Sequence, residues 1–113
     1  YTTLFRSYIT RTLSLSEPAE VLKVMFDANI PNSTSVQVYY RAWTGNDTDL
    51  KKLKWIDTGF ASVAKDAISD FIEREVTVTS IPSYNNIQIK IVFKSTVPSK
   101  VPQIKNLRVL ALT

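Results

Sequence analysis

The stretch Ala19–Thr44, AEVLKVMFDANIPNSTSVQVYYRAWT, decides the fold of this chain. Apolar or aromatic residues occupy every second position in both of its halves: Leu22, Val24, Phe26 and Ala28, then Val36, Val38, Tyr40 and Ala42. Between the halves lies PNST (31–34), whose residue types favour a turn. This pattern predicts two β-strands joined as a hairpin, with the apolar row facing the core.

Further alternating stretches lie on both sides of it and predict more strands: Phe5–Leu15, Trp55–Asp57, Asp70–Thr79, Asn86–Lys94 and Gln103–Leu112. We expect Pro18 to end the first of them, because proline has no amide hydrogen to donate. Arg11 is expected near that strand's end or reaching to solvent. Phe60–Ile68 shows no clear period and is predicted to be a loop with a short helix or strand.

The last predicted strand, Gln103–Leu112, is apolar on both faces near its end. This favours either a central position in a sheet or an edge that another chain covers. The strand spacing and long connections predict an all-β fold, a single antiparallel β-sandwich of jelly-roll or Greek-key type with about seven or eight strands. We expect residues 1–113 to form one domain. Because the chain begins at Tyr1, we also expect it to be excised from a larger protein.

Composition narrows the possible chemistry. The chain has 113 residues, no cysteine and no histidine, so it has neither thiolate nor imidazole ligands. Its net charge of +4 is a weak indication of an anionic partner. No apolar run approaches the length of a membrane-spanning helix. We therefore expect no cofactor and no membrane span.

Two acidic groups could carry chemistry. Glu73 and Glu75 are two positions apart on one strand, so they point to the same face and lie about 6.5–7 Å apart. This separation falls within the range found in inverting glycosidases. One strand cannot place them on opposite sides of a sugar, so a solvated face is the better interpretation and we expect no enzyme. The loop Asn46–Asp49 offers oxygen ligands that suit Ca²⁺, but it lacks the full calcium-loop pattern and also fits an ordinary turn.

The candidate contact residues are Tyr39, Arg41, Trp43 and Trp55. The first three share the outward face of their strand by alternation, and Trp55, like Tyr84, lies beside a loop. Such a group has three interpretations: a face covered by the domain's own segment within residues 45–68, a protein interface, or a sugar-binding platform. The nearby lysines (51, 52 and 54) also suggest single-stranded nucleic acid, but they fit a solvated row better, so we regard nucleic acid as a poor candidate.

Three segments together resemble a β-sandwich module of virion structural proteins in tailed phages, found in baseplate or tail-fibre components. The resemblance rests on YITR (8–11), FDAN (26–29), VYYR (38–41), QIKI (88–91) and Pro102 with LRV (107–109). The chain departs from the family pattern at Asn32 and Ser33, where a glycine is usual, which leaves the turn type open. Carbohydrate-binding sandwich modules have a similar architecture.

The resemblance implies a non-catalytic structural or attachment module located in the virion. Its expected partners are other virion proteins, copies of itself, or a glycan of the host surface. The alternative function is a carbohydrate-binding module that recognises a glycan through its exposed aromatic residues.

Overall fold

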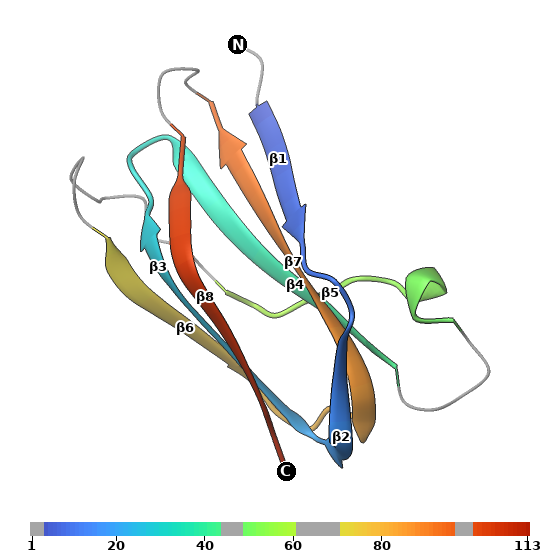
Figure 1. The fold of residues 1–113 in the computed structure, drawn as a ribbon. Coiled ribbons are helices and arrows are strands. Elements are labelled where there is room, and N and C mark those ends of the chain that lie inside the picture. The colour runs from blue at the N-terminus through green and yellow to red at the C-terminus, as the bar shows by residue number, and fades with distance from the viewer. Residues whose placement is uncertain (1–3, 44–48, 61–70, 97–100) are drawn as a thin grey trace.

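A computed structural model describes residues 4–43, 49–60, 71–96 and 101–113. It is an all-β sandwich of two antiparallel sheets, which confirms the predicted fold class (Figure 1). The described strands are β1 (Leu4–Ile9), β2 (Leu13–Ala19), β3 (Val21–Asn29), β4 (Thr34–Trp43), β5 (Ile56–Asp57), β6 (Ile72–Val78), β7 (Tyr84–Ser95) and β8 (Gln103–Leu112). A short 3₁₀ turn, η1, covers Leu50–Lys52.

The large sheet has the order β1-β7-β4-β5, and β2 also pairs with β7. The small sheet has the order β6-β3-β8. In both sheets most neighbouring strands lie far apart in the sequence, as in sandwiches of the Greek-key type. The large sheet is therefore four strand positions wide, whereas the small sheet is three.

The predicted hairpin over Ala19–Thr44 is wrong. β3 belongs to the small sheet and β4 to the large sheet, so the two strands do not pair with each other. The turn between them crosses from sheet to sheet, with the Thr34 hydroxyl donating to the Pro31 carbonyl at 2.7 Å and Ser33 at a φ of +69°. Alternation specifies only which face of each strand is buried, and that part of the prediction is confirmed.

The core lies between the two sheets. Leu22, Val24 and Phe26 of β3 have no exposed surface, and neither has Val38 of β4. Ile87, Ile89 and Ile91 of β7 complete it, as their alternation predicted. Phe60 packs against Phe26 with ring centroids 5.4 Å apart, while the rest of the ambiguous segment, residues 61–68, lies outside the described residues.

The predicted first strand is two strands, β1 and β2, on the same edge of β7. The break lies at Thr10, whose backbone amide donates to the Ile89 carbonyl at 2.9 Å and whose hydroxyl accepts from the Ile89 amide. Arg11 is exposed at this break, close to a strand end as expected. Pro18 does not end the strand, which continues to Ala19. The pairing of β2 with β7 shifts register before Ala19, and an edge strand tolerates proline there.

β8 is an edge strand, since among the described strands it pairs only with β3. Asn106 has a φ of +56° and adds an extra residue opposite Phe26, which makes a β-bulge. Lys105 pairs with Asp27 before the bulge and Arg108 pairs with Met25 after it, so both basic residues lie on the outer face. The bulge places Ile104 on the same face as Leu107, but Leu110 and Leu112 are exposed on the outer face, so the end of the strand is apolar on both faces.

Candidate functional site

The outer face of the large sheet holds the predicted contact residues. Tyr39, Arg41 and Trp43 of β4 are half-buried there. Arg41 donates from Nε and Nη2 to the side-chain oxygen of Gln88 on β7, at 2.9 and 2.7 Å. Its Nη1 also donates to the Lys51 carbonyl at 3.1 Å, which ties β4 to η1. A planar guanidinium can donate these three hydrogen bonds to two acceptors at once.

Trp55 lies against Arg41. The guanidinium carbon is 4.2 Å from the centre of the Trp55 ring, a close cation–π contact. The Lys90 ammonium on β7 lies over both aromatic rings, 5.5 Å from the centre of Trp55 and 5.7 Å from that of Tyr39. Trp55 immediately precedes β5 at the edge of the sheet, and its ring contacts Arg41 of β4 and Lys90 of β7. We call Tyr39, Arg41, Trp55 and Lys90 the aromatic–cation cluster.

The cluster continues across the sheet through Gln88. This side chain is 7% exposed, and its amide nitrogen donates to the Thr10 carbonyl at 3.1 Å. A continuous set of contacts thus runs from Trp55 through Arg41 and Gln88 to the break between β1 and β2. Sequence alternation placed Gln88 and Lys90 on the solvent side of their strand. It missed their roles because it does not give the register between β7 and β4.

The structure separates two other aromatic residues from the cluster. Trp43 lies opposite Asn86 at the end of the β4–β7 ladder. Tyr84 begins β7 directly after the connection from β6, as expected, but it is completely buried, so the expectation of an exposed ring is wrong. Its hydroxyl donates to the Val21 carbonyl at 2.9 Å. Burial raises the pKa of Tyr84, with a smaller contribution from nearby Tyr40.

The segment after β4 partly covers this face. Leu50 is buried, and Lys51 accepts a hydrogen bond from Arg41, so η1 lies against the sheet. The interpretation of a face covered by the domain's own segment therefore holds for Arg41. Tyr39, Trp43 and Trp55 keep part of their surface exposed.

The candidate acidic residues have basic or backbone partners. Glu75 pairs with Lys23 at 3.3 Å, and Glu73 lies 3.6 Å from Arg108 on the exposed face of the small sheet. Asp49 accepts the Lys51 amide as the cap of η1. No group of three acidic residues that could hold a metal ion occurs within the described residues, and positions 46–48 of the suggested calcium loop lie outside them.

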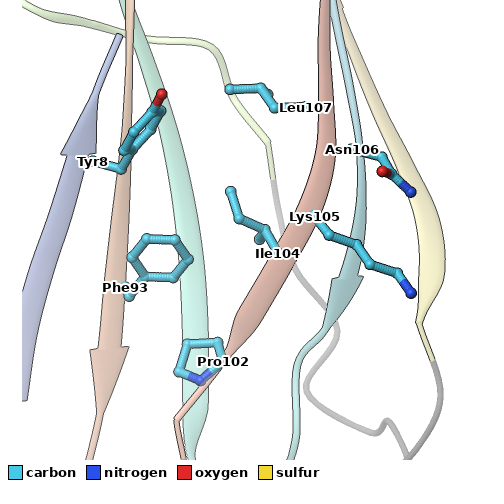
Figure 2. Close-up of a pocket in the computed structure, with 7 residues that line it drawn as sticks. All are labelled: Tyr8, Phe93, Pro102, Ile104, Lys105, Asn106 and Leu107. Atoms are coloured by element: carbon cyan, nitrogen blue, oxygen red, sulfur yellow. The ribbon is translucent and has the colours of Figure 1, made fainter.

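A groove opens between the two sheets beside β8. Tyr8 of β1 and Phe93 of β7 form one wall, and Pro102, Ile104 and Leu107 form the other, as Figure 2 shows. Its cavity volume is about 380 Å³. No sequence pattern indicated this groove, because Tyr8 lies in one row with polar residues and Phe93 had the pattern of an ordinary core position.

No helix among the described residues is long and apolar enough to cross a membrane. No known protein family matches the chain, and neither a characterised protein nor a solved structure is similar enough to count as a match.

Proposed function

We propose that this domain is a non-catalytic structural or attachment module of a phage virion, in the tail, the baseplate or a fibre, which holds other protein chains. The virion setting comes from the sequence resemblance described above. The observation that carries a contact role is the open side of the sandwich, where the edge strand β8 stands beside the apolar groove lined by Tyr8 and Phe93. Edge strands and uncovered apolar surface are features that protein partners cover.

The placement of the acidic side chains supports a non-catalytic role. Glu73 and Glu75 lie on an exposed face, each within 4 Å of a basic side chain. A general acid in a glycosidase instead needs a raised pKa, which a buried or crowded carboxyl provides.

The virion setting can be tested with an antibody raised against the domain. We expect the antibody to detect the chain in particles purified from the virus that encodes it, and to label one part of the tail in electron micrographs. Detection only in the particle-free fraction of the lysate would contradict the proposal. Particles that are first stripped of loosely bound protein by high salt provide the control.

Glycan binding is the second candidate, and one observation favours it. Arg41 and Lys90 belong to the sheet beneath Trp55, so they contact the ring face that points toward the sheet. Trp55 keeps part of its surface exposed, and this exposed part is the surface on which a sugar would stack. Glycan-array binding that is lost in Trp55→Ala, but kept in Trp43→Ala, would favour this candidate. A glycan array presents many copies of each sugar, so even stacking of about 1 kcal/mol per site is enough for capture. Absence of binding to every glycan at about millimolar concentration would therefore exclude the glycan-binding function.

A further inference from the structure

We propose that the free edge of β8 and the groove beside it receive one extended strand from another protein chain, with apolar side chains facing inward and acidic side chains facing outward. The inference deepens the proposed function by naming the class of partner. It rests on that function only for the source of the strand.

The position of Tyr8 shows where the sandwich is incomplete. Tyr8 pairs with Ile91, so both side chains lie on the inner face of the large sheet. Ile91 has no exposed surface, whereas Tyr8 is 51% exposed. The small sheet therefore covers β7 but ends before β1. Figure 2 shows the Tyr8 and Phe93 rings directed from their strands toward Ile104 and Leu107.

A fourth strand beside β8 would fill this position. The large sheet is four strand positions wide and the small sheet three, so an added strand would lie over Tyr8. None of the described strands pairs with the outer edge of β8, which leaves alternate backbone amides and carbonyls on both sides of the bulge to bind a further strand. The Asn106 carbonyl, at the bulge itself, accepts from Arg108 Nε. Pairing of an extended peptide with an exposed sheet edge is a general mode of peptide recognition.

The side chains around the edge define the chemistry of the occupant. Inward side chains of an added strand would contact Tyr8, Phe93 and Leu107, which are apolar or aromatic. Exposed Arg6, which pairs with Phe93 on the same face, lies at the rim of this surface.

Outward side chains would lie beside Lys105, Arg108 and Leu110, which are all exposed. On the side toward β3 and β6, Arg108 already contacts Asp27 and Glu73, and Lys105 lies over the Phe71 ring. Opposite charges across neighbouring strands are favourable and like charges are not, so acidic residues fit the outward positions.

A second copy of the folded domain does not fit this edge. Antiparallel pairing of two β8 strands would place both large sheets on the same side of the shared small sheet. Because β7 lies opposite β8 and β1 lies beyond it in each copy, β1 of one copy would occupy the space of β7 of the other. A single extended segment has no such strand and enters freely.

The test uses the domain and a peptide of about eight residues that alternates valine and glutamate, blocked at both ends. Residue-resolved hydrogen exchange by NMR follows the amides of β8. In the free domain we expect fast exchange at the alternate amides that do not face β3, and slow exchange at these amides once the peptide is added. The substitution Tyr8→Glu should weaken binding by about tenfold or more, because it places a charge in the apolar groove that the valine side chains of the peptide would enter. The matched control Ile56→Glu changes an equally exposed residue at the opposite edge and should bind as the wild type does.

Peptide controls keep the test independent of the folding of the variants. Lysine in place of glutamate should weaken binding, and N-methylation of the peptide amides that face β8 should abolish it. Absence of binding by the glutamate peptide, or binding away from β8, would overturn the proposal. Slow exchange of these amides in the free monomer would also overturn the proposal, because the chain itself would then fill the groove. Slow exchange that appears only when sedimentation shows dimers would overturn it as well, because a second copy would then cover β8. None of these results changes the particle experiment, so the two proposals can fail separately.

Discussion

Arg41 and Gln88 are joined by two hydrogen bonds to the same side-chain oxygen, at 2.9 and 2.7 Å, between the central strands of the large sheet. Gln88 in turn donates to Thr10 on the neighbouring strand position. Three strand positions of the sheet are therefore connected through one buried amide side chain. The contact is polar and specific in geometry, which makes it sensitive to the shape of the cation.

The first prediction concerns this pair. Arg41→Lys keeps the charge but cannot reach Gln88, Lys51 and Trp55 together, because an ammonium group lacks the planar fork. We expect the free energy of unfolding in urea to fall by about 1–2 kcal/mol. Arg11→Lys, at an exposed position, should change it by less than about 0.5 kcal/mol. Equal effects of the two substitutions would show that the Arg41 contacts contribute nothing to stability.

The second prediction concerns the buried hydroxyl of Tyr84. Tyr84→Phe removes its bond to the Val21 carbonyl and should cost about 1 kcal/mol near neutral pH. Tyr40→Phe is the matched control, since Tyr40 is also in the core and burial raises its pKa as well. We expect a smaller loss for Tyr40→Phe, measured by urea unfolding at pH 7.

The raised pKa of Tyr84 also gives a third prediction, for alkaline pH. In the unfolded chain a tyrosine loses its proton near its ordinary pKa of 10.0, whereas buried Tyr84 keeps its proton to higher pH. The unfolded state then binds fewer protons than the folded state, so stability falls as pH rises above about 10. The fall should be shallower in Tyr84→Phe than in the wild type. Parallel curves for the two proteins would show that this hydroxyl titrates alike in both states.

The sequence predicted the class of fold and most of the strands because burial on one face leaves a period of two. It could not predict how strands pair, because the same alternation suits a hairpin and a crossing between sheets. The turn at Pro31–Thr34 joins two sheets, and nothing in its residue types distinguishes that from a hairpin turn. At the candidate site, alternation placed Tyr39 and Arg41 on one face but could not show that Gln88 and Trp55 meet Arg41 there. Those contacts depend on the register of β4 against β7 and β5.

The fourth prediction tests the turn at Ser33. Its φ of +69° lies in the left-handed region, which costs a residue with a side chain about 1–2 kcal/mol and glycine almost nothing. Ser33→Gly should therefore raise the free energy of unfolding by up to about 1 kcal/mol, after subtraction of the greater freedom of glycine in the unfolded chain. Ser33→Ala keeps the strain and should give no gain in thermal unfolding. A loss of stability in the glycine variant would contradict the left-handed geometry.

The last prediction concerns Asn106, whose bulge sets the direction of every side chain that follows it in β8. Asn106 has a φ of +56°, and its side-chain amide donates a hydrogen bond to the Asp27 carboxylate at 2.8 Å. The same carboxylate lies 3.5 Å from Arg108. Asn106→Gly keeps the backbone conformation but loses the hydrogen bond, and should cost up to about 1 kcal/mol. Asn106→Ala loses the bond and also places an ordinary side chain in the left-handed region, so it should cost about 1–2 kcal/mol more than the glycine variant.

The two variants therefore separate backbone conformation from side-chain bonding. Removal of the bulge by deletion of Asn106 is the third arm. Without the extra residue, Leu107 alone lies opposite Phe26 and faces inward, and Arg108 stays opposite Met25 and faces outward. We therefore expect the deletion variant to keep cooperative unfolding, measured by circular dichroism, and to bind no more hydrophobic dye than the wild type. Loss of cooperative unfolding would show that β8 needs the bulge for more than the direction of its side chains.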